Sequence, residues 1–593
     1  MRRLWRTLRG EDRRGRKLRG LLALLRPYRG RVILMLLALV VAVAAALAPP
    51  YLAGRAIDDG LRAGDLGALN VIVALLIGSA LLNFAATYAQ TYLVSWVGQR
   101  SLQDLRIRLF QHLQGLSVGF YSRRRTGVVI SRITNDVQAL DQLVTDGVVT
   151  LFSSTLTLLG TAAILLLLDP ELALITFLTF PLLAAGSVVF RLASAGAYRL
   201  TREKIALITA YLQETLSGIR IVRAFGQEER HKDELRELNE ANRAANMKTV
   251  NLNAAYFPSV ELLSAVATAG ILLYGGNQVI DGNGVTIGVL ASFVFYLQNF
   301  FDPIQQLSQL YTTYQAGMAA LDKIFELLDE EPEIVDGPGE LPQVRGSIRF
   351  DDVSFSYGGS LSRSELALDG VSLDVPPGQT VALVGATGAG KSTMAKLVAR
   401  FYDPDSGRVL VDGHDLRDVT EGSLRSQLGI VPQEGFLFSG TIRDNIAFGR
   451  PGGSDEDVVV AAQAVGAHEF IERLPDGYDT EVGERGGHLS AGQRQLVAFA
   501  RAAAADPRIL ILDEATSNVD VHTEARIEAG LRRLLAGRTA LVIAHRLSTI
   551  RGAGRILVLD HGRIAEQGSH DELIAAGGAY ARLYRDWAEQ AAA

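Results

Sequence analysis

Cysteine is absent from the 593 residues of this chain. Its absence excludes disulfide bonds, zinc–thiolate sites and cysteine-dependent catalysis within the sequence. Lysine is scarce, at seven residues, so arginine carries almost all of the positive charge. The formal net charge of −5 shows no excess of basic residues and argues against a nucleic-acid partner.

The composition lies between that of a soluble enzyme and that of a membrane protein. Hydrophobic residues make up 48% of the chain and charged residues 21%. The length also exceeds that of one ordinary domain. These values predict a membrane part that is joined to a soluble part.

Six apolar stretches each contain enough residues to cross about 30 Å of hydrocarbon. They lie near residues 32–57, 69–94, 143–168, 172–192, 252–278 and 286–310. Three of the intervening loops are short, whereas residues 95–142 and 193–251 form two long basic loops. Because positive charge stays on the cytoplasmic side, the long loops and both termini are expected inside the cell. The sequence therefore predicts a six-helix membrane domain over residues 32–326.

The two long loops have a helical rather than a turn-like composition. This predicts membrane helices that continue well into the cytoplasm. Near its middle, around residues 117–127 and 216–226, each loop carries an aromatic residue, arginines and glycine. We expect short helices there that dock on another domain; the alternative is a solvated helical hairpin.

A few polar side chains interrupt the apolar spans. Glu261 lies in the fifth span, and Gln298, Asn299 and Asp302 lie in the sixth. Charged groups at membrane depth are costly and usually face a bundle interior or a wet cavity. These four residues are therefore candidates for a transport cavity, although Asp302 precedes Pro303 and could instead mark the end of the span.

Residues 1–31 carry twelve Lys and Arg residues. Leucines at positions 18 to 25 lie among these arginines and predict a short amphipathic helix on an anionic cytoplasmic membrane surface. The alternative is a disordered basic tail. A cleaved signal peptide is not expected, because the apolar run that follows is too long.

Residues 327–345 are rich in proline, glycine and acidic residues and form the predicted linker to an α/β domain over residues 346–590. In this domain the apolar run 380–384 precedes a segment that fits the phosphate-loop pattern G-x-x-x-x-G-K-[ST]. The segment consists of Gly385, Ala386, Thr387, Gly388, Ala389, Gly390, Lys391, Ser392 and Thr393. Backbone N–H groups at such a helix N-terminus bind a polyphosphate. Lys391 is expected to reach the β- and γ-phosphates and Ser392 to ligate Mg²⁺.

Three further features predict hydrolysis of a nucleoside triphosphate. Residues 508–514 form an apolar strand that ends in Asp513 and Glu514, which we assign to the metal and to the catalytic base. Residues 541–545 form a strand that ends in His545, placed to sense the γ-phosphate. Residues 489–493 lead into a helix expected to begin at Arg494, and Ser490 with the amides that follow forms a second anion-binding helix N-terminus, which predicts that two copies of the domain meet face to face.

With this combination of motifs, the chain resembles an ATP-binding cassette transporter of the exporter type over residues 16–590. The resemblance implies six all-α membrane helices with long cytoplasmic extensions, then an α/β P-loop ATPase domain with an α-helical subdomain. It implies ATP and Mg²⁺ as cofactors, and coupling helices at 117–127 and 216–226. It also implies that Tyr357 stacks on adenine, that Gln433 joins Ser392 and Asp513 around Mg²⁺, and that Asp520 belongs to the D-loop. The signature offered to the partner's nucleotide would be Ser490, Ala491, Gly492 and Gln493.

The sequence departs from this family at Ala491, where the pattern has glycine. Alanine is unfavourable if the position requires a positive φ, and its methyl group would lie near the partner's γ-phosphate. A full acid set beside an altered signature resembles one half of an asymmetric heterodimer. We therefore favour a heterodimer with a second half-transporter chain over a homodimer.

The function implied is ATP-driven export of amphipathic drugs, lipids or other hydrophobic small molecules across the bacterial cytoplasmic membrane. Two alternatives remain: an importer built on the exporter fold, like some siderophore carriers, and an ATP-gated or regulatory membrane protein. The second predicts defects at Glu514 or His545, and both residues are present. The sequence does not identify the substrate.

Overall fold

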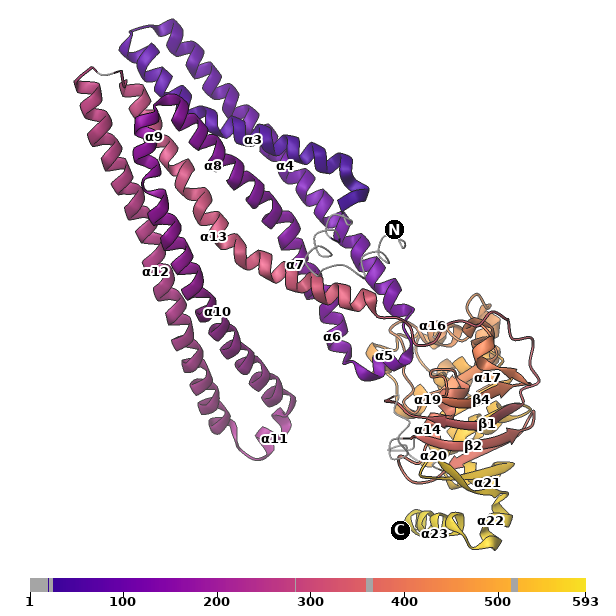
Figure 1. The fold of residues 1–593 in the computed structure, drawn as a ribbon. Coiled ribbons are helices and arrows are strands. Elements are labelled where there is room, and N and C mark those ends of the chain that lie inside the picture. Colours follow the sequence, from indigo (N-terminus) through magenta and orange to yellow (C-terminus); the bar gives the residue numbers. More distant parts are fainter. Residues whose placement is uncertain are drawn as a thin grey trace. The chain divides into compact units, whose positions relative to one another are not determined.

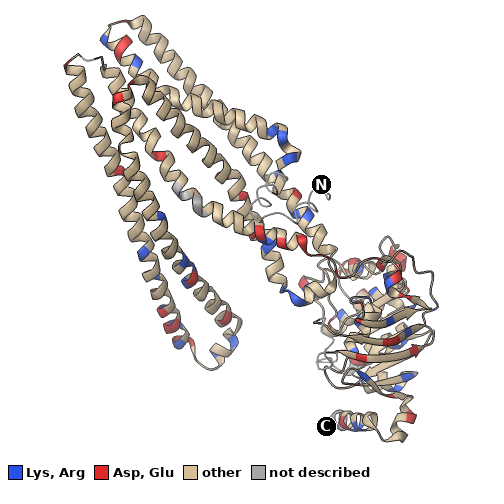
Figure 2. Cartoon of the chain, viewed as in Figure 1, with Lys and Arg blue, Asp and Glu red and all other residues tan. Residues whose placement is uncertain are grey.

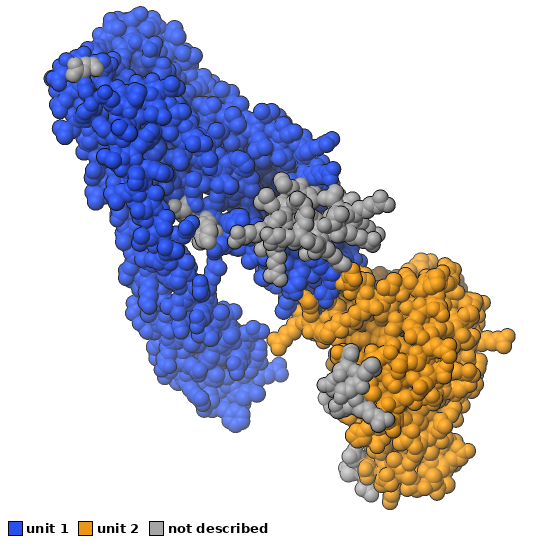
Figure 3. Space-filling model, viewed as in Figure 1, with its two compact units in different colours: residues 1–114, 126–330 blue, residues 115–125, 331–593 orange. Residues whose placement is uncertain are grey.

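The computed structural model describes residues 20, 25–282, 284–358, 366–513, 521–544 and 546–592. The chain divides into two compact units (Figures 1 and 3). Unit 1 consists of residues 1–114 and 126–330, and unit 2 of residues 115–125 and 331–593.

Unit 1 is entirely helical in its described part. Its elements are η2 (Arg26–Tyr28), α3 (Arg29–Arg55), η3 (Ala56–Arg62), α4 (Leu66–Gln114), α6 (Thr126–Ser131), η4 (Arg132–Asp136), α7 (Val137–Gln142), η5 (Leu143–Gly147), α8 (Val148–Leu168), α9 (Pro170–Phe177), α10 (Phe180–Ser217), α11 (Ile219–Ala224), α12 (Glu228–Ile280) and α13 (Ile287–Asp329). Among the described residues, six helical segments are long and apolar enough to cross a membrane. This confirms the prediction of six spans.

The cytoplasmic extensions are also confirmed. Helices α10 and α12 contain 38 and 53 residues, whereas a bilayer requires only about 20. Figure 2 shows Lys, Arg, Asp and Glu gathered at the ends of α10 and α12 that meet α11, while the remainder of both helices is largely uncharged. The apolar core of unit 1 draws on α3, α8, α9, α10, α12 and α13, with Phe293 and Tyr296 fully buried.

Unit 2 contains α5 (Val118–Arg123) and an α/β domain with two sheets. Its strands are β1 (Ile348–Phe355), β2 (Leu368–Val375), β3 (Thr380–Val384), β4 (Ser406–Val411), β5 (His414–Asp415), β6 (Leu428–Val431), β7 (Ile509–Asp513), β8 (Thr539–Ile543), β9 (Arg555–Asp560) and β10 (Arg563–Gly568). An antiparallel sheet has the order β2-β1-β4-β5, and a six-stranded sheet has the order β10-β9-β3-β8-β7-β6. Strands β6, β7, β8, β3 and β9 are parallel, as an α/β ATPase domain requires.

The helices of the α/β domain are α14 (Lys391–Val398), η6 (Leu416–Asp418), α15 (Glu421–Arg425), α16 (Ile442–Ala447), α17 (Asp455–Val465), α18 (His468–Glu472), η7 (Gly477–Asp479), η8 (Glu484–Gly486), α19 (Ala491–Ala504), α20 (Val521–Leu535), α21 (Leu547–Gly552), α22 (His570–Ala576) and α23 (Ala579–Ala592). Alternate residues of β3 face opposite ways, as the period of a strand requires. Val381 and Leu383 pack in one core with α14 and the antiparallel sheet, whereas Ala382 and Val384 pack in the other with α17 and α19. The six-stranded sheet is thus buried on both faces.

Candidate functional site

The phosphate loop joins β3 to α14, as the sequence predicts. Its three glycines all have positive φ, with +144° at Gly385, +84° at Gly388 and +106° at Gly390. A side chain at Gly385 would collide with the carbonyl oxygen of Leu559, and one at Gly390 would lie 2.7 Å from that of Ala367. Both positions therefore require glycine for space as well as for φ.

Lys391 is folded over this loop. Its Nζ donates hydrogen bonds of 2.8 Å to the carbonyl oxygens of Gly385 and Ala386, and the residue is only 8% exposed. Burial lowers the pKa of Lys391, while the negative charge of Asp513 acts in the opposite direction. The ammonium group therefore lies within electrostatic reach of the acid at the end of β7.

The carboxyl ends of the parallel strands gather the remaining groups at one edge of the sheet. Asp513 ends β7, Gln433 follows the adjacent β6 by two residues, and the phosphate loop follows β3. Ser392 is exposed on the first turn of α14, Gln433 is exposed, and Asp513 is half-buried. These three side chains supply the hard oxygen ligands that Mg²⁺ prefers, so the donor set fits that ion. Glu514, Asp520 and His545 lie outside the described residues.

Tyr357 lies beside the phosphate loop, two residues after β1. Its hydroxyl forms a 3.1 Å hydrogen bond with Thr393 Oγ1 and lies 3.4 Å from Lys396 Nζ. The ammonium group of Lys396 is also 5.2 Å from the centre of the ring. The residue is 42% exposed, so part of it is open to solvent. Lys396 was not singled out from the sequence, and its position in the same helix as Lys391 is the signal that could have identified it.

The signature turn is the N-terminus of α19. Ser490 caps the helix: its Oγ accepts from the amide of Gln493 at 3.2 Å, while Gln493 Oε1 accepts from the amide of Ser490 at 2.9 Å. Ala491 is the exposed first residue of the helix and is not among the residues with positive φ, and Gly492 is buried. The expected cost of a positive φ at Ala491 is therefore not incurred, because the position is helical.

The polar residues of the spans lie on two helices of unit 1. Glu261 is exposed on α12, whereas Gln298 and Asp302 are exposed and Asn299 is half-buried on α13. Helix α13 continues through Pro303 to Asp329, so the helix itself does not end at Asp302.

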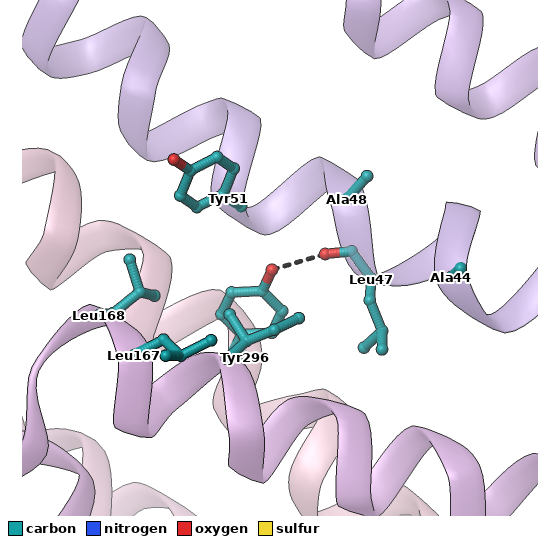
Figure 4. A pocket seen from close by; sticks show the side chains of 8 residues that line it. Ala44, Leu47, Ala48, Tyr51, Leu167, Leu168 and Tyr296 are labelled. Carbon is teal, nitrogen blue, oxygen red and sulfur yellow. Dashed lines mark hydrogen bonds between the residues drawn. The ribbon is translucent and has the colours of Figure 1, made fainter.

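A separate cavity of about 480 Å³ opens between α3, α8 and α13 (Figure 4). It is lined by Ala44, Leu47, Ala48, Tyr51, Ile164, Leu167, Leu168 and Tyr296. The hydroxyl of Tyr296 donates to the carbonyl oxygen of Leu47 at 2.5 Å, and Figure 4 shows this bond crossing from α13 to α3. None of the four polar candidates lines this cavity, whose walls are apolar apart from the two tyrosines.

Comparison with known proteins finds a matching family for each part of the chain. Residues 32–304 match the family described as ABC transporter transmembrane region, and residues 368–517 match the ABC transporter family. An ATP-dependent lipid A-core flippase of Syntrophus aciditrophicus is 39% identical over 95% of this chain and 93% of its own length. A multidrug efflux ATP-binding/permease protein of Mycobacterium tuberculosis is also 39% identical over 95% of this chain, which spans 47% of that longer protein.

A solved structure of a bacterial Atm1-family ABC exporter with ATP bound has a TM-score of 0.77 and 35% identity, and the match covers 95% of this chain and 98% of that one. The fused membrane and nucleotide-binding units, the six spans and these matches lead to one conclusion. The chain belongs to the ABC transporter family as an exporter-type half-transporter, a multi-pass protein of the bacterial inner membrane that couples ATP hydrolysis to transport.

Proposed function

We propose that this transporter exports amphipathic drugs, lipids or other hydrophobic small molecules by alternating access. The observation that carries the proposal is the apolar cavity of about 480 Å³ between α3, α8 and α13, within the size range of small-molecule sites. Its walls suit an acyl chain or an aromatic group better than an ion or a sugar. The names of the flippase and the efflux relative point to the same substrate class.

The proposed ATP site uses the groups at the carboxyl edge of the sheet. Lys391 and the loop amides hold the phosphates, and Tyr357 stacks on adenine. Ser392, Gln433 and Asp513 hold Mg²⁺, which when bound neutralises charge on the phosphate oxygens. Glu514 orients and deprotonates the attacking water, and His545 contacts the γ-phosphate. ATP then favours the closed pair of cassettes through contacts that exist only in that state.

The second half of each ATP site comes from a partner chain in this proposal. Ser490 and the first amides of α19 form an exposed anion site remote in sequence from the phosphate loop, and Asp520 belongs to the same interface. The argument for a heterodimer rested on two effects of Ala491, a strained backbone and a methyl group near the partner's γ-phosphate. Because Ala491 has a helical conformation, the first effect does not apply. We therefore propose that the chain is able to form a homodimer, with a second half-transporter as the alternative partner.

The variant Glu514→Gln tests the proposal. The amide keeps the shape of the side chain but is not a base, so we expect ATP binding to persist while hydrolysis falls by about a hundredfold or more. Steady-state ATPase activity and nucleotide binding would be measured on the full chain in lipid nanodiscs. Glu469→Gln, an exposed acid on α18, is the matched control and should behave like the parent.

Direction is tested with the same protein in liposomes. With ATP outside, cassettes that face outward should drive a fluorescent phospholipid analogue or a cationic dye into the lumen, and Glu514→Gln should not. Loss of preloaded dye would identify an importer. Passive ion flux that requires ATP binding but persists in Glu514→Gln would identify an ATP-gated channel. Hydrolysis by Glu514→Gln at the parent's rate would disprove the assignment of the base.

A further inference from the structure

Three aromatic rings pack against one another beside the phosphate loop. Phe355 ends β1, Tyr357 follows it by two residues, and Tyr402 lies four residues beyond the end of α14. The ring centres of Tyr357 and Tyr402 are 5.2 Å apart at an interplanar angle of 89°, and Phe355 lies 5.0 Å and 5.4 Å from the two tyrosines. Tyr357 is 42% exposed and Tyr402 only 8%. The more exposed ring thus lies directly against a buried one.

The other side of Tyr402 contacts helix α5, which belongs to the same compact unit. The hydroxyl of Tyr402 donates to Ser122 Oγ at 3.1 Å, and Ser122 Oγ donates onward to the carbonyl oxygen of Val118 at 3.2 Å. A Cβ at Gly119 would lie 3.1 Å from Tyr402 Cε1, so the glycine allows the ring to lie against the helix. Tyr402 therefore contacts Tyr357, the residue proposed to stack on adenine, on one side and α5 on the other.

Residues at both ends of α5 form polar contacts with the segment that precedes the α/β domain. Ser117 Oγ accepts from the amide of Ile334 at 3.0 Å, and Arg123 forms an ion pair with Glu333. Phe120 is buried at 3% exposure. Along the chain, α5 follows α4 and precedes α6, both of which belong to the membrane-spanning part. Only residues 115–117 and 124–125 separate α5 from these two helices along the chain.

We propose that Tyr402 is a positioning residue that links occupancy of the ATP site to α5. Stacking of adenine fixes the ring of Tyr357, the ring of Tyr357 fixes that of Tyr402, and the hydroxyl of Tyr402 holds Ser122. This inference rests on the proposed function, in which Tyr357 contacts adenine. The contact between Tyr402 and Ser122 joins residues 280 positions apart.

The absence of native cysteine gives a direct readout. With Ala48→Cys as the only thiol, on the wall of the cavity, the alkylation rate by a maleimide reports the state of the membrane helices. The rate would be measured on the full chain in lipid nanodiscs over a series of MgATP concentrations. In this background, Tyr402→Phe and Ser122→Ala each remove the hydrogen bond and keep the ring packing.

We expect each variant to raise the ATP concentration for the half-maximal change about three- to tenfold, the range that one hydrogen bond supports. The double variant should show no larger shift than either single one, because both remove the same contact. Tyr580→Phe is the matched control: it also removes a buried hydroxyl, bonded to His570 at 2.7 Å, and should leave the ATP dependence unchanged. Shifts under twofold, or shifts that multiply in the double variant, would overturn the inference.

Failure of the proposed function gives a different pattern. Tyr357→Ala should raise the KM for ATP more than it lowers kcat. An unchanged KM would disprove the adenine contact and, with it, the first step of the proposed link from ATP through Tyr357 and Tyr402 to α5. A labelling rate that ATP does not alter in the parent would disprove alternating access itself. A raised KM in Tyr357→Ala with independent effects at Tyr402 and Ser122 would disprove the proposed link alone.

Discussion

Ala491 has the conformation of an ordinary first helical residue, and this decides what its side chain does. The signature turn takes its shape from the reciprocal hydrogen bonds between Ser490 and Gln493, which do not involve the side chain at position 491. The methyl group of Ala491 is exposed at the N-terminus of α19. Its influence is therefore steric and is exerted on whatever anion the turn binds.

Ala491→Gly separates the two roles of this residue. Glycine is up to about 1 kcal/mol less favourable than alanine in a helix, so we expect an unchanged or slightly lower melting temperature. Removing the methyl group should lower the KM for ATP about twofold if it crowds the partner's γ-phosphate. Thermal unfolding and ATPase titrations of the full chain would measure both effects. A melting temperature several degrees above that of the parent would show that alanine is strained at this position.

The residues that are local in sequence could be predicted, and those joined by the fold could not. The phosphate loop and its strand and helix were predicted because glycine spacing and apolar runs act over ten to twenty residues. Tyr402 carried no such signal, because its partner Ser122 lies 280 positions away. Strand β1 also depends on its partner in the sheet, because its register against β2 shifts between Phe350 and Val353, near Asp352 with φ of +51°.

At the scale of elements, the turn between β4 and β5 is hydrogen-bonded to the residues that precede β1. Asp412 lies between β4 and β5 with φ of +47°. Its carboxylate accepts hydrogen bonds from the amides of Arg345, Gly346 and Ser347, the last at 2.7 Å. Burial by itself would raise the pKa of Asp412, but hydrogen bonds from Ser347, Arg345 and Gly346 outweigh it and lower the pKa.

This lowered pKa makes the stability of the α/β domain depend on pH. Because the pKa of Asp412 is lower in the folded chain, its stabilisation is present above the unfolded value of about 3.9 and is lost as the pH falls through the folded value. Asp412→Asn should lower the stability by about 1 kcal/mol at pH 7, and the difference should shrink below about pH 4. Melting temperatures of the parent and the variant from pH 3.5 to pH 8 would test this.

The exposed Asp476→Asn is the control for this series and should melt like the parent at every pH. A difference between Asp412→Asn and the parent that stays constant down to pH 3.5 would contradict the role of the charge and leave only a role in shape. The three amides belong to the end of the segment between α13 and β1, so loss of these bonds would release that end from the turn after β4.

At the scale of the whole molecule, the phosphate loop and the signature turn, proposed to form two halves of an ATP site, begin helices that pack in different cores of the α/β domain. The phosphate loop lies at the carboxyl edge of the six-stranded sheet, whereas Ser490 begins a helix packed in the other core with α17. In the proposed dimer, each site is completed by the signature turn of the partner chain. Complementation between two inactive variants measures this directly.

Lys391→Ala removes the phosphate-binding side, and Ser490→Ala removes the cap of the signature turn. In a homodimer each variant alone has no intact site, and ATPase activity should fall by about a hundredfold or more. A mixed dimer pairs the phosphate loop of one variant with the signature turn of the other, so one of its two sites is intact. We expect such dimers, isolated through two different affinity tags in lipid nanodiscs, to regain roughly half of the parent's activity if the sites act independently.

Mixed dimers without activity would contradict completion in trans. A parent chain that is monomeric and inactive when expressed alone would instead identify a second half-transporter as the obligate partner, because only a foreign signature turn could then complete the site that Lys391 begins.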